Sequence, residues 1–498
     1  PTPPMTPPLS RLLAIALAVG PALSPGSIRA DEFRTFTNST GKTLKAKLVG
    51  KTGEQATIAL ENGREFTVPV TSLSPEDQAY IAEWDPARAD ATPLTEDQGV
   101  SAEKFNEVIG HPLFADISLW DSNPEKVAER LQWPRESQTS YAESYRLYPP
   151  GEFRFLGARP FSAALYGEEG KVSGISLVFA NKGDSFGARG SGEEHFIKGK
   201  PVPGGIEGFR MIMENDAELI STALTELLGE GESQRFGDGE TRTRAMRWDW
   251  SGHAFLLSHV EDEYVGLTIQ TTEFADKRGR ISRVPESIIR ERARSGIETR
   301  ANGDVVLSNL PMVDQGPKGY CAPATVERCM RYLGIPADMY LLAMVGETQL
   351  GGGTSTSLLL ENIGQDLKRK GRKFDRWRDE LSMRTIKRYI DDGIPVMWGM
   401  FSTKEFNDIA TARTEERKEI LANEGDFSAY AAKVRTESEN NTLPPDNNRS
   451  HIVIIIGYNE ETNEIAFSDS WGERFQERWI TLPEAHQISQ DYFYVIDL

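Results

Sequence analysis

The apolar run from Ile452 to Ile456, directly after His451 and before Gly457, restricts the fold of this chain more than any other segment. Its five residues are all β-branched, and it is far shorter than the roughly 18 apolar residues of a membrane span. A short continuous run of this kind predicts a strand buried inside a sheet. His451 would then project from a rigid element, which suits a side chain that must hold a fixed position.

The next predicted strand, from Ile465 to Ser468, ends beside a carboxylate. It follows a turn near residues 459–463, so we expect it to run antiparallel to the strand after His451. Asp469 comes directly after it, and two neighbouring strands can place the Asp469 and His451 side chains together. The carboxylate would then fix the tautomer of the imidazole. The indole of Trp471 would cover their hydrogen bond from water.

A thiol stands at the start of a predicted helix. The Gly- and Pro-rich loop that begins at Pro311 ends in Cys321, and the apolar residues after it recur at the spacing of one buried helix face. Unpaired N–H groups at a helix N-terminus stabilise a thiolate and lower a pKa that is about 8.5 in a free thiol. Gln315 lies six residues upstream, so its amide can point to where an oxyanion would form beside the Cys321 N–H. Cys329 lies about 12 Å along the same helix, too far for a disulfide, and is predicted to be a core thiol.

The order and spacing of these residues resemble those of papain-like cysteine peptidases. Gln315 precedes Cys321 by six positions, and His451 follows about 130 residues later. Asp469-Ser470-Trp471-Gly472 stands in place of the usual Asn-Ser-Trp-Gly of that family. The resemblance covers about residues 305–498 and implies a papain-like fold there.

Three departures from papain narrow the resemblance. Lys318 stands where papain has a disulfide cysteine, and Ala322 replaces the aromatic residue after the nucleophile. The third member of the triad is an aspartate, Asp469. This combination is more similar to the bacteriocin-processing, double-glycine type of peptidase and its stand-alone relatives.

The resemblance implies a role for each matching residue. Cys321 would be the nucleophile, His451 the general base and acid, and Asp469 the residue that orients the imidazole. Gln315 would be the oxyanion donor. The reaction would be acyl transfer: the thiolate attacks a carbonyl, a thioester forms, and a water that His451 deprotonates hydrolyses it. The implied substrate is a peptide or protein, and no cofactor is needed.

The substrate-binding residues rest on a weaker pattern. Gly351-Gly352-Gly353 precedes a predicted helix from Leu358 to Leu367 and is either an N-cap loop or an open wall that a substrate backbone can approach. On the second interpretation we assign Gly352, Gly353 and Trp471 to substrate binding. Residues 401–449 form a charged, helix-rich insertion, which we expect to rim the cleft and limit substrate access.

Two other functions would use the same residues. Another acyl transfer in the cell envelope, by an amidase or a transpeptidase, would need the same triad, and product analysis with peptide and cell-wall substrates would separate it from peptide hydrolysis. A non-catalytic peptide-binding pseudoenzyme would keep the cleft without the reactive thiol. A buried Cys321 with an incidental His451 is the structural alternative to all of these.

Residues 1–30 are predicted to be a secretory signal peptide. An apolar run of 12 residues, from Leu12 to Leu23, follows Arg11 and precedes a small-residue stop at Ala30. A disordered N-terminal tail is the alternative. We therefore expect export to the periplasm or the extracellular space, with no membrane span left after signal removal.

Residues 31–84 are predicted to form a small β-barrel. Short β-type runs alternate with turns, Asn62-Gly63 is typical of a tight hairpin, and Ser74-Pro75 favours a helix start. The segments Arg34-Thr35-Phe36 and Thr71 to Ser74 resemble the Sla-type homology domain, an SH3-like barrel. The resemblance implies a protein or peptide ligand for this domain, and a passive spacer is the alternative.

The middle of the chain is predicted to hold a linker, an α+β domain and a hinge. Residues 85–98 are polar with two prolines and form the linker, and residues 284–304 form a charged hinge. Between them, residues 99–283 alternate helical and β-type segments. The stretches 161–179 and 255–269 each follow a helix, which suggests a duplicated unit. Both an inhibitory pro-segment and a substrate-binding domain fit this region.

The composition agrees with a multidomain α+β protein and excludes several partners. A length of 498 residues indicates about three domains. The formal net charge of -19 repels phosphate backbones, so nucleic acid is not an expected partner. Two cysteines are too few for a disulfide scaffold or a four-thiolate zinc site, and no histidine stands in a metal-ligand spacing. We therefore expect no metal.

Overall fold

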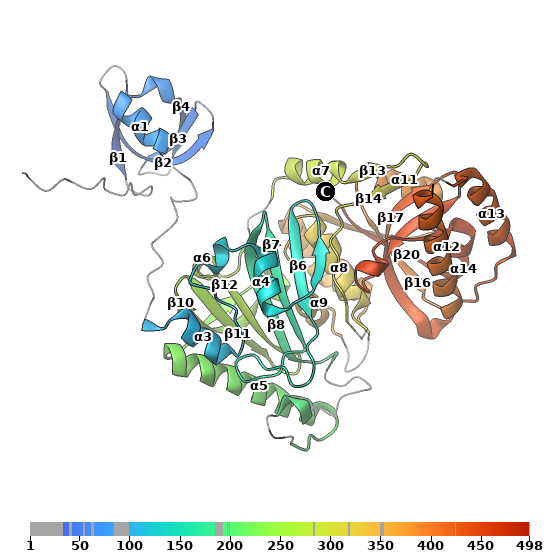
Figure 1. The fold of residues 1–498 in the computed structure, drawn as a ribbon, viewed down its shortest axis with the longest axis horizontal. Helices are drawn as coiled ribbons and strands as arrows, with labels where there is room; N and C mark the ends of the chain where they lie inside the picture. Colours follow the sequence, from blue (N-terminus) through green and yellow to red (C-terminus); the bar gives the residue numbers. More distant parts are fainter. Residues whose placement is uncertain are drawn as a thin grey trace, which may run out of the picture. The chain divides into compact units, whose positions relative to one another are not determined.

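The chain separates into two units, residues 1–94 and residues 95–498 (Figure 1). The structure, a computed structural model, describes residues 33–38, 42–52, 55–60, 64–83, 99–184, 193–196, 198, 200–281, 284–316, 319–348, 353–423 and 425–497. The predicted signal peptide, the linker and the Asn62-Gly63 turn therefore lie outside the described residues. Among the helices described, none has both the length and the apolar character needed to cross a bilayer.

The first unit is an antiparallel sheet followed by a helix. Its apolar core contains Phe36, Leu48, Ile58 and Ile81. Ser74 accepts a hydrogen bond from the Asp77 N–H at 3.2 Å, as expected for the start of the helix. The elements are β1 (Arg34–Thr37), β2 (Thr43–Thr52), β3 (Gln55–Leu60), β4 (Glu65–Pro69) and α1 (Pro75–Glu83).

The predicted SH3-like barrel is not confirmed, because the described strands do not form a closed barrel. The sheet order is β1-β2-β3-β4, with β1 paired to β2 and β4 paired to β3. After β4 the chain turns through Val70–Ser72 into α1 instead of continuing as a strand beside β1. Within the described residues, an isolated β-bridge between Asn38 and Leu73 links the end of β1 to the segment before α1.

Residues 99–283 contain a sheet built from two similar halves. Each half is a helix followed by four antiparallel strands, and the halves join where β8 pairs with β12, giving the order β5-β6-β7-β8-β12-β11-β10-β9. This topology agrees with the predicted duplication and with an α+β class. The elements are α3 (Ala102–Ile109), α4 (Pro124–Leu131), β5 (Arg135–Gln138), β6 (Ala142–Leu147), β7 (Ser162–Glu168), β8 (Lys171–Asn181), α5 (Gly205–Leu228), β9 (Glu232–Phe236), β10 (Thr243–Trp250), β11 (His253–Val260), β12 (Tyr264–Thr271) and α6 (Thr272–Asp276).

The helices of this region bury one face against the sheet. The Asn123 side chain caps α4 and Pro124 is its first residue, as the sequence predicts. Helix α5 packs on β8, β10, β11 and β12, with Phe209 and Ile220 buried in the same core as Trp250 (Figure 1). The eight strands therefore form a continuous sheet with a core of its own.

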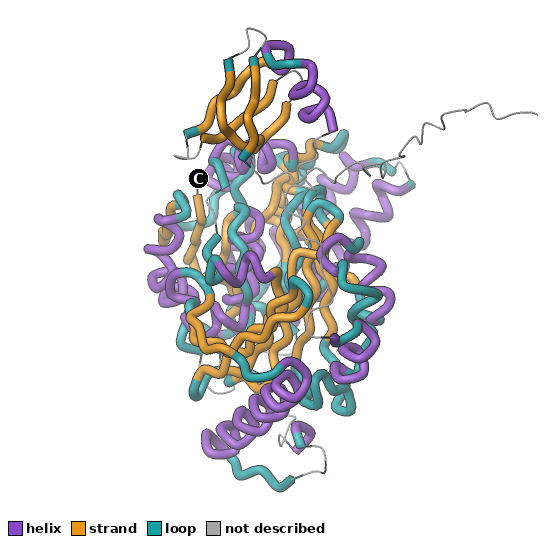
Figure 2. Tube along the Cα trace, turned by 90° about the vertical axis from the view of Figure 1, so that its left-hand side faces the viewer, coloured by secondary structure: helices purple, strands orange, loops and turns teal. Residues whose placement is uncertain are grey.

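Residues 284–498 form a second mixed layer of strands and helices. The strand order is β13-β14-β17-β16-β20-β15, and β18 and β19 extend the sheet from β17. Helices and strands are mixed throughout residues 95–498 (Figure 2). The elements are α7 (Glu286–Ser295), β13 (Ile297–Thr299), β14 (Val305–Leu307), α8 (Cys321–Tyr332), α9 (Met339–Val345), α10 (Thr356–Arg369), β15 (Lys373–Arg378), α11 (Met383–Ile390), β16 (Val396–Phe401), α12 (Lys404–Ala422), α13 (Phe427–Asn440), β17 (Ser450–Asn459), β18 (Glu464–Ser468), β19 (Arg478–Thr481), α14 (Leu482–Ile488) and β20 (Ser489–Asp497).

The segment 284–304, which we expected to be a hinge, contains α7 and β13. Ile289 and Ala293 of α7 are buried in the core of the C-terminal region. Strand β13 pairs with β14, which in turn pairs with β17. Of the charged residues of this segment, those from Glu286 to Arg294 lie on α7, whereas Glu298 lies on β13 and Asp304 is buried just before β14.

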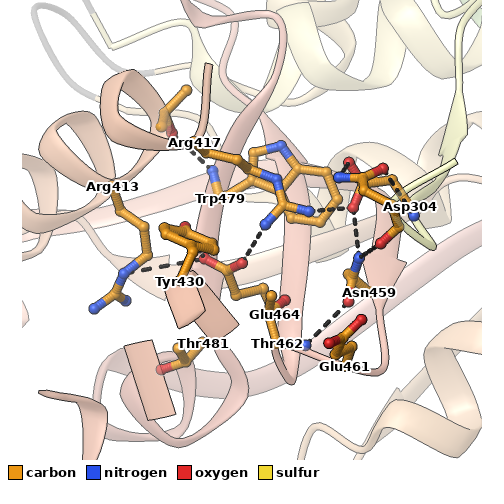
Figure 3. Close-up of polar contacts among 12 residues, drawn as sticks. Asp304, Arg413, Arg417, Tyr430, Asn459, Glu461, Thr462, Glu464, Trp479 and Thr481 are labelled. Atoms are coloured by element: carbon orange, nitrogen blue, oxygen red, sulfur yellow. Dashed lines mark hydrogen bonds and ion pairs between the residues drawn. The ribbon is translucent and has the colours of Figure 1, made fainter. Parts of the chain in front are cut away.

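Two arginines anchor the insertion at 401–449 to the sheet. Arg417 of α12 lies between the carboxylates of Asp304 and Glu464, with its guanidinium 3.9 Å from the ring centre of Trp479 (Figure 3). Arg413 lies one turn earlier on α12 and pairs with Glu484 of α14. Because these charges are buried, their pairing holds α12 firmly against β18 and β19.

Candidate active site

Cys321 is the first residue of α8, where the sequence predicts a helix to begin. The preceding residue, Tyr320, provides no side-chain cap, so the N–H groups of the first turn are available near the sulfur. The backbone N–H groups of Ala322 and Ile452 hydrogen-bond the thiol. Cys321 is partly exposed, whereas Cys329 is fully buried and burial raises its pKa to about 12. The two cysteines therefore differ in exposure and in the direction of their pKa shifts.

His451 and Asp469 lie side by side on neighbouring antiparallel strands. His451 is the second residue of β17, which is buried along nearly its whole length, and Asp469 directly follows β18. The Nε2 atom of His451 lies 2.9 Å from Oδ1 of Asp469. The His451 side chain also hydrogen-bonds Cys321. The three side chains thus form a continuous chain from sulfur to imidazole to carboxylate.

The three groups shift one another's ionisation. Burial would raise the pKa of Cys321, but the hydrogen bond and the charge of His451 outweigh it and lower that pKa. Burial would lower the pKa of His451, but its hydrogen bonds to Asp469 and Cys321 raise it to about 10. The same imidazole, together with Arg478, lowers the pKa of the buried Asp469. The arrangement therefore favours the ion pair of a thiolate and an imidazolium over the neutral pair.

Arg478 was not among the residues singled out from the sequence. It begins β19, is buried, and donates from a terminal guanidinium nitrogen to Oδ2 of Asp469 at 2.8 Å. The same guanidinium donates to the carbonyl of Asn407 and to the Thr411 hydroxyl, both on α12. A charged residue at the start of the apolar strand Arg478–Thr481 was the available sequence signal. The insertion therefore contacts the arginine that pairs with Asp469.

Gln315 and Trp471, the other residues expected at the site, contact the segment around Asp469 and the His451 ring. The backbone N–H of Gln315 donates to the carbonyl of Ser470 at 2.8 Å, which brings the Gln315 loop beside Asp469. The Trp471 indole stacks on the His451 imidazole with ring centres 4.8 Å apart. This stacking covers one face of the imidazole. That the indole shields the hydrogen bond between His451 and Asp469 from water stays a prediction.

A cavity of about 680 Å³ opens beside Cys321 and His451. Gly352 lies outside the described residues, and Gly353 is next to the lining without being part of it. The expectation that the insertion rims the cleft is wrong, since none of the described residues of 401–449 lines this cavity. Its lining consists of Cys321, Thr354, Ser355, Thr356, Ser357, Arg376, Trp377, Arg378, Gly399, Ser450, His451, Ile452, Gln490, Tyr492 and Tyr494.

The cavity has two walls, one formed by strands and one by a helix. On one side β15, β20, β16 and β17 present neighbouring residues across the sheet, such as Arg378 opposite Tyr492 and Tyr492 opposite Gly399. On the other side lies the N-terminal turn of α10, where Ser357 is 2.9 Å from the Tyr494 hydroxyl. The described residues contain no cluster of three or more metal-ligating side chains.

The opposite pKa shifts predict the pH dependence of any reaction that uses the Cys321 thiolate and the His451 imidazolium. The reactive pair forms as pH rises through the lowered pKa of Cys321 and is lost as His451 deprotonates near pH 10. We expect kcat/KM to rise below the usual thiol pKa of about 8.5, reach a plateau and fall near pH 10. Rates measured from pH 4 to 11 test this. A single ionisation at or above the usual thiol pKa would contradict it.

Replacing the Asp469 carboxylate by the amide that papain-like peptidases usually have at this position should be harmful in this protein. In Asp469→Asn, one oxygen can still accept from His451, but the amide NH₂ then faces the donating guanidinium of Arg478. A charged donor left without an acceptor costs about 1.5 to 3 kcal/mol, so kcat/KM should fall by about 10- to 100-fold. The double variant with Arg478→Met should recover part of this loss. Unchanged kinetics in Asp469→Asn would show that Arg478 does not constrain this position.

Comparison with known proteins points to a family for the C-terminal region. Residues 307–495 match the Peptidase_C39 like family. A crystal structure of the peptidase domain of Streptococcus ComA, described as a bifunctional ABC transporter involved in a quorum sensing pathway, is 12% identical over 37% of this chain and 96% of that chain, with a TM-score of 0.24. No curated protein matches the chain. Residues 307–495 are thus similar to the Peptidase_C39 like family, and this match supports a C39-type cysteine peptidase in the C-terminal region.

Proposed function

We propose that this chain is an exported papain-like cysteine peptidase that hydrolyses peptide bonds through a thioester on Cys321. The observation that carries the proposal is the hydrogen-bonded chain from Cys321 through His451 to Asp469 beside the cavity of about 680 Å³. A thiol that only filled space in a core would not be paired with an imidazole that is itself oriented by a buried carboxylate.

The proposed mechanism assigns one task to each residue. The Cys321 thiolate attacks the scissile carbonyl, and the negative charge that develops on the carbonyl oxygen is stabilised by the Gln315 side chain and the Cys321 backbone N–H. The imidazolium of His451 donates a proton to the leaving amine, which leaves a thioester on sulfur. His451 then takes a proton from water, and the hydroxide formed releases the acid product and the thiolate. Asp469, held by Arg478, keeps the imidazole oriented throughout.

The experiment that tests this function is a peptide-library digestion by the purified protein, with products identified by mass spectrometry. Wild-type protein should cut a subset of peptides, and the profile should define the residues on either side of the cleaved bond. Pre-treatment with an epoxide-type thiol reagent should stop cleavage and label Cys321. Release of products from cell-wall fragments but not from any peptide would overturn the proposal in favour of an amidase or transpeptidase.

Export and a binding role for the first unit belong to the same proposal. Export rests on the Arg11 and Leu12–Leu23 pattern, and the N-terminal mass of protein secreted from cells tests it. A protein or peptide ligand of residues 31–84 rests on their resemblance to the Sla-type homology domain. Such a ligand would bring the peptidase to its substrate or to the cell surface.

A further inference from the structure

Residues 99–283 bond directly to the loop that leads to Cys321. The contacts come from β5, from the residue after β6 and from the end of β8. They reach the loop at Met312, Asp314 and Tyr320. The loop that carries Gln315 is therefore held from outside the papain-like region.

One peptide group of this loop is held at both ends. The Tyr148 hydroxyl donates to the carbonyl of Asp314 at 2.6 Å, and the N–H of the same peptide group, that of Gln315, donates to the carbonyl of Ser470 at 2.8 Å. Burial raises the pKa of Tyr148, so its hydroxyl stays protonated and able to donate. Gln315 projects from this peptide group. Its orientation therefore depends on Tyr148 on one side and on the loop after Asp469 on the other.

The next residue shows how closely Tyr148 fits the loop. Gly316 has a φ of +70°, and a Cβ there would lie 2.8 Å from the Tyr148 ring. Its N–H donates to the side chain of Asp314 at 2.9 Å. Only glycine combines this backbone conformation with so close an aromatic ring. The backbone of the loop therefore packs closely against the Tyr148 ring.

Strand β5 adds two hydrogen bonds to the same loop. A bulge at Glu136 turns the side chains of both Glu136 and Ser137 inward, although they are consecutive in sequence. Ser137 accepts from the Met312 N–H at 2.9 Å, and Glu136 accepts from the Asp314 N–H at 2.8 Å. The Glu136 carboxylate is itself buried and paired with Arg146 at 2.6 Å. A charge-assisted acceptor of this kind holds the loop more strongly than a neutral one.

A fourth contact reaches the residue next to the nucleophile. The Tyr320 hydroxyl donates to Asn181 at 2.6 Å, at the end of β8. Tyr320 also packs edge-on against Tyr340, in a core that includes Val178 and Tyr264 of the middle sheet. The start of α8 is thus fixed from the same side as the Gln315 loop.

We propose that residues 99–283 are a permanent part of the active site, in which Tyr148 is a positioning residue that aims the Gln315 side chain at the developing oxyanion. This inference rests on the proposed function. It assigns the middle region a supporting role and predicts that separating it from the C-terminal region abolishes activity, which is the opposite of releasing an inhibitory pro-segment. Preorganised donors act because they need no reorganisation during the reaction, so a loosened Gln315 loses part of its effect.

The test compares two tyrosine substitutions that flank the same strand. Tyr148→Phe removes the hydroxyl that holds Asp314, and Tyr141→Phe removes one that donates to the Asn309 carbonyl at 3.3 Å, also between the two regions but away from the Gln315 loop. We expect Tyr148→Phe to lower kcat by about 3- to 10-fold, with KM within about twofold. Tyr141→Phe should leave both values within about twofold of wild type. Loss of kcat in neither variant, or the same loss in both, would overturn the inference.

Two further measurements separate positioning from general damage. The effect of Tyr148→Phe should disappear in a Gln315→Ala background, since the hydroxyl acts through that side chain. Alkylation of Cys321 by iodoacetamide forms no oxyanion, so its rate should be unchanged in Tyr148→Phe. Additive losses in the double variant, or slowed alkylation, would overturn the inference.

The inference remains testable if the proposed function fails. If wild-type protein cuts no peptide, the peptidase proposal is wrong, and backbone amide exchange then tests the loop alone. Tyr148→Phe should speed deuterium uptake in peptides that cover residues 312–316 by at least about threefold, and Tyr141→Phe should not. Unchanged uptake in that segment would overturn the positioning role of Tyr148.

Discussion

Cys321→Ala is expected to lower peptide hydrolysis by a factor on the order of 10⁵ to 10⁶. The reason is that His451 pairs with this sulfur and with Asp469, so that no other nucleophile stands in the hydrogen-bonded chain. Peptide binding should be nearly unchanged, since most of the residues that line the cavity belong to other elements. Single-turnover rates and peptide binding by fluorescence anisotropy measure the two effects separately.

Cys329→Ala is the matched control for this result. Cys329 lies on the same helix and is fully buried, and burial raises its pKa to about 12, so it carries no thiolate at neutral pH. The variant should lose some stability through a small cavity but keep kcat within about twofold. Equal activity of Cys321→Ala and wild type, or equal loss in the two alanine variants, would refute the assignment of the nucleophile.

Arg417→Met is expected to destabilise the protein by about 3 to 5 kcal/mol. The substitution keeps much of the side-chain length but leaves the buried carboxylates of Asp304 and Glu464 facing each other without their shared cation. It also removes the guanidinium stacked on Trp479. Urea denaturation followed by tryptophan fluorescence measures the change. The matched control is Arg474→Ala, whose exposed side chain lies 4.0 Å from Glu415 and should matter by less than about 0.5 kcal/mol.

The destabilisation by Arg417→Met should depend on pH with a definite sign. Burial raises the pKa of Glu464, and Arg417 is the largest influence that opposes this rise. Without Arg417 the folded-state pKa rises further above its value in the unfolded chain, so the folded state gains from protonation. Stability lost at pH 8 should therefore be partly recovered at pH 5. The same loss at both pH values would show that the carboxylates find another partner.

Local patterns were sufficient to predict which elements carry Cys321, His451 and Asp469. Cys321 begins its helix where the loop ends, and the run after His451 is the buried strand β17, paired antiparallel with β18 as expected. These features follow from periodicity and from a short turn between adjacent strands, which involve residues close in sequence. The repeat in residues 99–283 was visible for the same reason.

The supporting residues could not be predicted because they come from distant parts of the chain. Arg478 holds Asp469 only because α12 folds behind β19, and Tyr148 meets Asp314 across 166 residues. A charged residue in a strand or a tyrosine after one has many possible partners, and sequence alone does not say which is chosen. The expected position of residues 401–449 was wrong for this reason. Arg413 and Arg417 are buried, although charged side chains of this kind are typical of a protein surface.

The two outer strands of the duplicated sheet, β5 and β9, have different surroundings. In a repeat of this kind β5 and β9 occupy equivalent edges, and an exposed edge is a template for aggregation between molecules. On β5, the side chains of Glu136 and Ser137 accept hydrogen bonds from the loop before Cys321. Strand β9, Glu232–Phe236, is short and largely polar, a composition that discourages another chain from adding to it. Of the two outer strands of this sheet, β5 therefore contacts the loop that leads to Cys321, and the composition of β9 disfavours pairing with another molecule.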